Sequence, residues 1–114
     1  MTLGEVVKAL NLRVQTGGDD LGRTVEGGYV SDLLSDVIAG AKEGDIWVTL
    51  QLHQNIVAVA FLNNLAGIVI VGGREPDAET LKKAKEQGVP IMLTPMTSYE
   101  VAGKLYEMGI RRSG

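Results

Sequence analysis

The apolar residues of this chain recur with two different periods, and the change from one period to the other predicts its secondary structure. Short runs that are apolar throughout or at every second position, typical of strands, occupy residues 12–15, 25–30, 45–50, 66–71 and 90–94. Apolar residues three or four positions apart, typical of helices, occupy residues 3–10, 31–40, 77–87 and 97–108. Because strands alternate with helices, we expect one α/β domain over residues 1–114, with a mostly parallel sheet and flanking helices.

Residues that favour helix starts support these boundaries. Thr2 with Glu5, and Thr97 with Glu100, form the pattern of a capping box, in which the two side chains each bind a backbone amide of the other residue. Ser31 has the side chain of an N-cap and is expected to open the helix over residues 31–40.

The segment 54–64 fits two structures. Its centre, Ile56 to Leu62, is apolar at every position and suits either a buried strand or a helix that is apolar on all sides. We favour a helix, because parallel strands need a crossover and a helix here completes a strand–helix–strand unit between Trp47 and Ile70. A helix without a polar face needs cover, so we expect a homodimer or a larger assembly. Trp47 and Phe61 are expected in the core or in that interface.

Composition excludes several classes of function. The net charge of −3 and the pI near 5.1 argue against binding of nucleic acid. The chain has no cysteine and one histidine, which removes thiolate chemistry, cysteine-based metal sites and multi-histidine sites within one chain. No apolar run is long enough to cross a bilayer, and the first residues do not form a signal peptide. We therefore expect a cytoplasmic protein with no membrane contact, no metal site and no resident cofactor.

Polar residues gather where the predicted parallel strands end. In such sheets ligands bind beyond the carboxyl ends of the strands, where helix N-termini present free amides. No catalytic residue is predicted. The candidate ligand-binding residues are Ser31, Asp32, Gln51, His53, Gly73, Arg74 and Thr97.

The sequence Gly72-Gly73-Arg74 is the strongest sign of an anion site. Two glycines allow a backbone to approach an anion, and a guanidinium can bind an oxyanion with two hydrogen bonds. The alternative is an ordinary turn with a solvated arginine. No phosphate-binding loop and no Gly-x-Gly-x-x-Gly pattern follows any predicted strand.

Two acidic residues and the histidine allow further chemistry. Asp32 and Asp36 are four residues apart on the predicted helix, where two carboxylates suit magnesium binding, acid–base catalysis or, as we favour, a helix N-terminus. His53 suits a general base or a capping or interface role. We favour the second, because no residue is placed to complete a triad with it.

The chain resembles DRTGG domains. The likeness is carried by residues 21–37 (LGRTVEGGYVSDLLSDV), 41–49, 73–77 and 103–110. Of the family pattern Asp-Arg-x-x-Thr-Gly-Gly, the residues Arg23, Gly27 and Gly28 match, whereas Gly22 and Glu26 replace the aspartate and the threonine. The resemblance implies a regulatory or dimerising α/β module. Such domains occur alone, in some phosphate acetyltransferases and between the CBS domains of regulated pyrophosphatases, and they are similar to the non-catalytic N-terminal half of HPr kinase/phosphorylase.

These observations lead to three competing functions. We favour a non-catalytic module that senses a nucleotide or another small anionic metabolite, as a homodimer or beside a partner protein. The second is a structural dimerisation or adaptor module with no ligand. The third is a small enzyme that uses Asp32, His53 and Arg74 across a dimer interface. The missing phosphate-binding loop argues against the serine-kinase label that some free-standing copies carry.

Overall fold

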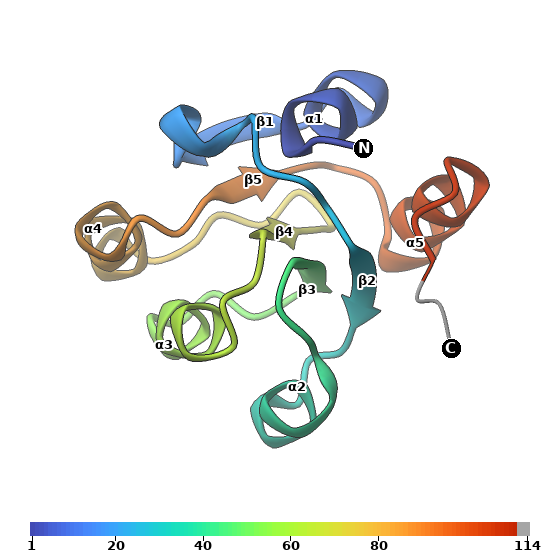
Figure 1. Cartoon of the computed structure of the whole chain (residues 1–114). Helices are drawn as coiled ribbons and strands as arrows, with labels where there is room; N and C mark the ends of the chain where they lie inside the picture. The colour runs from blue at the N-terminus through green and yellow to red at the C-terminus, as the bar shows by residue number, and fades with distance from the viewer. Residues whose placement is uncertain (112–114) are drawn as a thin grey trace.

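The computed structural model describes residues 1–111, and they form one α/β domain (Figure 1). The elements in chain order are α1 (Leu3–Leu10), β1 (Arg13–Thr16), the 3-10 helix η1 (Gly18–Asp20), β2 (Gly27–Val30), α2 (Leu34–Gly40), β3 (Asp45–Thr49), α3 (Asn55–Leu62), β4 (Gly67–Ile70), α4 (Ala78–Gln87), β5 (Ile91–Leu93) and α5 (Ser98–Glu107).

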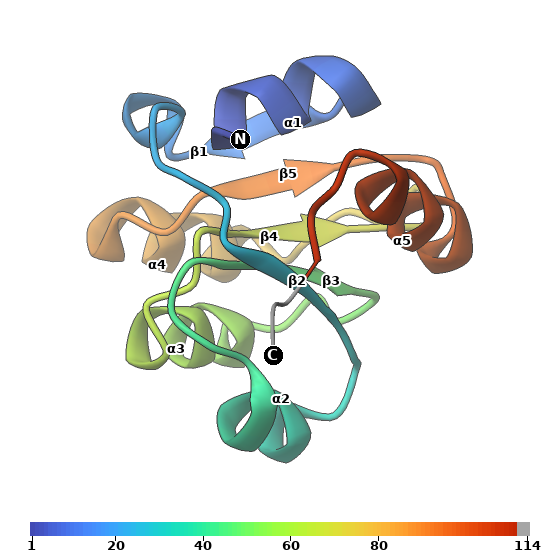
Figure 2. The ribbon, with the colours of Figure 1, turned by 45° about the vertical axis from the view of Figure 1, so that its right-hand side comes forward.

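The strands form one sheet in the order β1-β5-β4-β3-β2. Strands β2, β3, β4 and β5 are parallel to one another, and Figure 2 shows β4 and β5 running side by side in the same direction. Strand β1 is antiparallel to β5, and its register shifts between Val14 and Thr16. The predicted fold class, a mostly parallel sheet with flanking helices, is confirmed.

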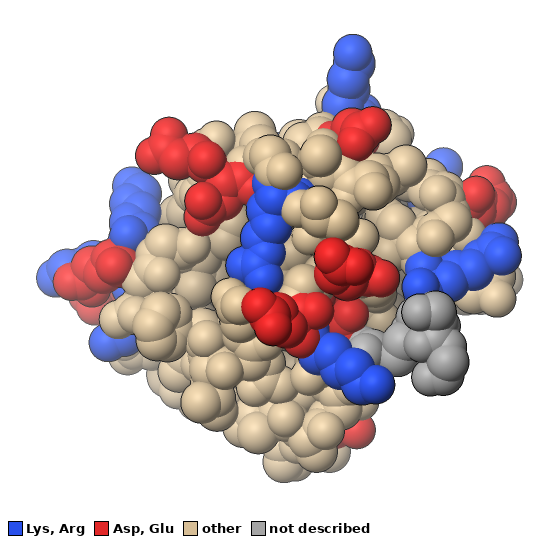
Figure 3. Space-filling view, in the orientation of Figure 1, with Lys and Arg blue, Asp and Glu red and all other residues tan. Residues whose placement is uncertain are grey.

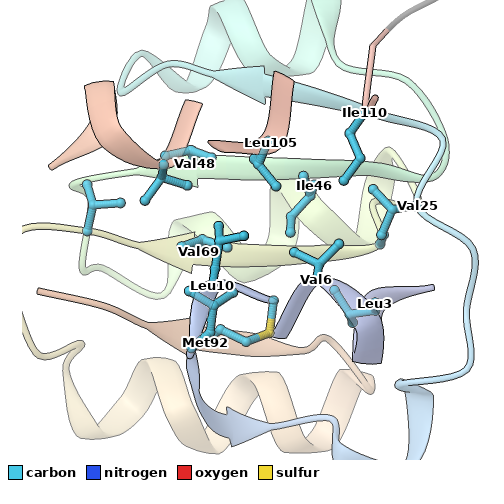
Figure 4. Packing of buried hydrophobic residues seen from close by; sticks show 14 residues of the cluster. Leu3, Val6, Leu10, Val25, Ile46, Val48, Val69, Met92, Leu105 and Ile110 are labelled. Atoms are coloured by element: carbon cyan, nitrogen blue, oxygen red, sulfur yellow. The ribbon is translucent and has the colours of Figure 1, made fainter. Parts of the chain in front are cut away.

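Helices cover both faces of the sheet. Figures 1 and 2 show α1 and α5 on one face and α2, α3 and α4 on the other. Successive side chains of a strand point to opposite faces. Ile46 and Val48 therefore join the core beneath α1 and α5 (Figure 4), whereas Trp47 joins the core beneath α2 and α3. All residues of β3 and β4 are buried, as expected of strands covered on both faces.

Local sequence predicts two of the helix starts and misplaces a third. Both capping boxes are present, at Thr2 with Glu5 and at Thr97 with Glu100. The prediction that Ser31 caps α2 is wrong, because the N-cap of α2 is Leu33. Ser31 instead makes a tight local turn, in which its hydroxyl oxygen accepts a hydrogen bond from the Leu33 N–H at 3.2 Å.

The ambiguous segment forms the helix α3, as predicted, but its cover differs from the prediction. The domain itself buries Ile56, Val57, Val59 and Ala60, so half of the helix needs no partner. Phe61 is not in the core of the chain, since 59% of its surface is exposed.

Asn63 joins the end of α3 to α2. Its side-chain amide donates to the carbonyl oxygens of Val37, Ile38 and Ala41 at 3.0–3.2 Å. The two helices therefore present one surface, and Figure 3 shows that this part of the molecule carries little charge. Its exposed large apolar residues, called here the α2–α3 face, are Leu33, Ile38, Phe61 and Leu62.

Candidate ligand-binding site

The loops that follow β2, β3, β4 and β5 meet at one edge of the sheet, because these strands are parallel. The start of β1 joins the same edge because β1 runs the opposite way, and Arg13 lies beside Leu93 at the end of β5. We call this edge the carboxyl edge. Six of the seven predicted ligand residues lie in its loops, and Thr97 caps the helix that follows the last one.

Asp32 links the ends of β2 and β3. Its Oδ1 accepts hydrogen bonds from the Thr49 hydroxyl at 2.8 Å and from the Leu50 N–H at 2.7 Å. The Gln51 side chain donates to the Asp32 carbonyl oxygen at 2.8 Å. The second carboxylate oxygen, Oδ2, has no partner among residues 1–111, so it is the atom that Asp32 can offer to a ligand.

The prediction that Asp32 and Asp36 share a helix face is wrong. Asp32 precedes α2 and points to β3, whereas the Asp36 carboxylate accepts a hydrogen bond from the Tyr29 hydroxyl at 3.0 Å. Within residues 1–111 no three histidine, aspartate or glutamate side chains are close enough to hold a metal ion together.

A shallow hollow of about 460 Å³ lies between the loops after β3 and β4. We call it the Asp32–Arg74 hollow, and it brings together four of the predicted ligand residues. They are Asp32, Gln51, His53 and Arg74, with Leu52 and Asp77 beside them. The Nδ1 atom of His53 accepts a hydrogen bond from the Asn55 N–H, the first amide of α3, at 3.2 Å, although the N-cap residue of α3 is Gln54.

The glycine pair shapes the neighbouring loop in a way that the sequence did not predict. Gly72 and Gly73 have φ angles of 76° and 70°, a region that side chains other than glycine rarely adopt. Their N–H groups donate to the carbonyl oxygens of Met96 and Thr94 at 2.8 and 3.0 Å. These two amides hold the loop against the end of β5, so they are not available to cradle an anion.

Arg74 follows the pair and lies at the border of two hollows. It is exposed and makes no hydrogen bond or ion pair with any other residue in the range 1–111. The second hollow, of about 290 Å³, is called the Arg13–Arg74 hollow. Its lining residues are Asn11, Arg13, Gly73, Arg74, Glu75, Leu93, Thr94 and Pro95.

Sequence reasoning missed Arg13 and Glu75. They are 62 residues apart, and their side chains form an ion pair with 2.7 Å between Arg13 Nη2 and Glu75 Oε1. Only the antiparallel direction of β1 places Arg13 at the carboxyl edge, and no local pattern predicts that direction.

Ser31 and Thr97 do not line either hollow. The Ser31 carbonyl oxygen accepts a hydrogen bond from the indole N–H of Trp47 at 2.8 Å, which holds the end of β2 over the buried ring. Thr97 is occupied by its capping box. Its backbone N–H, and secondly its hydroxyl, donate to the Glu100 carboxylate and lower the pKa of Glu100.

The residues of the family pattern lie at the opposite, amino edge. The guanidinium of Arg23 donates to the backbone carbonyl oxygen of Asn64 at 2.6 Å and to its side-chain oxygen at 3.2 Å. The Asn64 side chain in turn donates to Glu43 at 2.7 Å. Glu26 packs over Gly44, where a Cβ atom would lie 2.5 Å from the Glu26 Cγ. A Cβ at Gly22 would meet nothing within 4 Å. The pattern therefore joins loops here, and two of its positions, Arg23 and Glu26, also line a hollow of about 380 Å³.

The fold and the site together define a small three-layer α/β domain with two adjoining hollows at the carboxyl edge of its sheet. A family model described as the DRTGG domain matches residues 5–108, and the chain belongs to this family. A comparison with curated proteins gives no match. No helix within residues 1–111 has the length and apolarity needed to cross a membrane.

The chain is also similar to a solved structure, the CBS and DRTGG domains of the regulatory region of Clostridium perfringens pyrophosphatase. That structure is complexed with an activator, diadenosine tetraphosphate. The TM-score is 0.69 and the sequence identity is 18%. The match covers 90% of this chain and 44% of that chain, so this chain spans less than half of its neighbour. At this identity the likeness shows the fold.

Proposed function

We propose that this DRTGG domain is a non-catalytic regulatory module that binds a nucleotide or another phosphorylated anion at the carboxyl edge of its sheet. The observation that carries the proposal is Arg74. It is a guanidinium with no partner in the described chain, held at the border of two hollows by a loop fastened to β5. Such a group binds phosphate oxygens through charge-assisted hydrogen bonds.

The neighbouring groups suit the rest of such a ligand. In the Asp32–Arg74 hollow, Asp32 Oδ2 can accept hydrogen bonds from sugar hydroxyls, and the Gln51 and His53 side chains add polar contacts. The regulatory region of the similar pyrophosphatase was solved with a nucleotide activator, which supports the same class of ligand. We propose that the protein acts in the cytoplasm, as expected from the sequence.

Calorimetric titration with ATP at about 0.1 M salt tests the proposal, because longer-range attraction is screened under these conditions. Arg74→Ala should weaken binding by about 1.5–3 kcal/mol, the range for a hydrogen bond to a charged group. Lys82→Ala is the matched control, since it removes one positive charge from the exposed side of α4. Equal affinity of Arg74→Ala and Lys82→Ala would contradict the proposal.

We further propose that two copies associate through the α2–α3 face. Leu33 and Leu62 are 64% and 69% exposed, and α3 carries no charged residue that would oppose association. The same face supports the second candidate function, an adaptor that buries this surface against another protein and binds no small ligand. ATP binding that depends on Arg74 separates the first function from the second.

A further inference from the structure

The ion pair between Arg13 and Glu75 crosses the end of β5. In the sheet β5 lies between β1 and β4, and Arg13 stands beside Leu93, the last residue of β5. On the other side of β5, the Gly73 N–H is bonded to Thr94 and fixes the loop that carries Arg74 and Glu75. The two arginines therefore reach the same hollow from opposite sides of one strand end.

The Glu75 carboxylate binds the Arg13 guanidinium in the way that a phosphate group would bind it. One carboxylate oxygen accepts a hydrogen bond from one terminal nitrogen of the guanidinium at 2.7 Å. The two side chains are 64% and 66% exposed, so solvent screens their attraction and the pair contributes little to stability. A multiply charged anion that also contacts Arg74 can replace Glu75 with little loss to the domain.

We propose that Arg13 is a second phosphate-binding residue and that Glu75 is an internal competitor for it. The ligand is a nucleoside di- or triphosphate whose phosphates lie across Arg13 and Arg74. Its nucleoside lies in the Asp32–Arg74 hollow, which shares Arg74 with the phosphate subsite. This inference rests on the proposed function and adds two residues, a ligand class and a built-in restraint on affinity.

Calorimetric titration of the whole chain with ATP, pyrophosphate and adenosine tests the inference. Glu75→Gln should tighten ATP and pyrophosphate about two- to fivefold, because it frees Arg13 from a weak exposed ion pair. It should leave adenosine unchanged, since adenosine has no phosphate. Arg13→Ala should weaken ATP about tenfold or more, the effect of one charge-assisted hydrogen bond. Glu79→Gln, an exposed glutamate in the first turn of α4, is the control for net charge.

The combined variant separates competition from a general effect of charge. In the Arg13→Ala background, Glu75→Gln should no longer tighten ATP beyond the effect of Glu79→Gln. Two results would overturn this inference alone. In the first, Glu75→Gln still tightens ATP binding when Arg13 is absent. In the second, ATP binding depends on Arg74 but does not change when Arg13 or Glu75 is substituted. Failure of the wild-type chain to bind either ATP or pyrophosphate would overturn the proposed function with it.

Discussion

Arg23, the arginine of the family pattern, is expected to stabilise the fold and to have no part in ligand binding. It donates to two oxygens of Asn64, a residue with a φ of 53° between α3 and β4. Asparagine adopts this left-handed conformation more readily than most residues, and the bond to its carbonyl oxygen holds the turn in place. Through Asn64 and Glu43, Arg23 joins the lead-in to β2 to two other loops of the amino edge.

The size of the effect follows from these contacts. Hydrogen bonds from a charged donor contribute about 1.5–3 kcal/mol when buried. Arg23 is half-buried, so we expect Arg23→Ala to lower the free energy of unfolding by about 1–2 kcal/mol after allowance for solvent screening. For a domain of this size, that corresponds to a fall in Tm of about 4–8 °C.

Urea unfolding followed by circular dichroism measures this change, with ATP titration of the same variant as a second readout. Arg23→Lys should recover only a small part of the loss, because an ammonium group does not reproduce the planar fork of a guanidinium. The affinity for ATP should stay that of the wild type. The reasoning is refuted if Arg23→Ala unfolds like the wild type, or if it loses ATP binding while remaining equally stable.

Three further variants test the cap of α5 and the α2–α3 face. Thr97→Ala should destabilise the domain by about 0.5–2 kcal/mol in thermal unfolding, since the hydroxyl accepts the Glu100 N–H. The pKa of Glu100 is lowered in the folded state. Glu100→Gln should therefore be less stable than the wild type above the ordinary glutamate pKa of about 4.3, and this difference should disappear as the pH falls through the lowered pKa of Glu100. A difference in stability that persists in acid would contradict this. Phe61→Asp should give folded monomers in light scattering, because Phe61 is exposed within one chain, whereas the control Tyr99→Asp on α5 should leave the assembly intact; a wild-type monomer at micromolar concentration would refute the dimer.

Those parts of the fold that depend on local sequence were predictable. Alternating periods identified the strands and helices, and the two threonine–glutamate pairs form the capping boxes they predict. The need for a crossover between parallel strands decided that α3 is a helix. Its pattern did not reveal which side would be exposed, because a helix apolar at every position has no face that differs from another.

The errors came from interactions between distant residues. Ser31 has an N-cap side chain, but its carbonyl is held by Trp47, 16 residues away, and α2 begins three residues later at Leu34. Asp32 likewise binds Thr49 and Leu50 at the end of β3 instead of joining the helix. The strand order placed Arg13 beside β5, and nothing near residue 13 in the sequence predicts that neighbour.

The candidate site was predicted only in part, because some of its contacts also join residues that are distant in the sequence. The rule that ligands bind beyond the carboxyl ends of parallel strands led to Asp32, Gln51, His53 and Arg74, which one hollow brings together. The sequence left two alternatives for the glycine pair, an anion site or an ordinary turn. The amides of Gly72 and Gly73 are bonded to the loop after β5, as in a turn, and anion binding by Arg74 stays a prediction.

The central claim is that a phosphorylated ligand binds at the carboxyl edge of the sheet. The most direct test is a titration of the ¹⁵N-labelled chain with ATP, followed by the backbone amide signals in two-dimensional NMR. The account predicts saturable shifts at residues 50–53 and 72–75 and at Arg13, with residues 22–27 and 43–44 of the amino edge unchanged. Shifts confined to the amino edge, or no saturable shift at millimolar ATP, would contradict it.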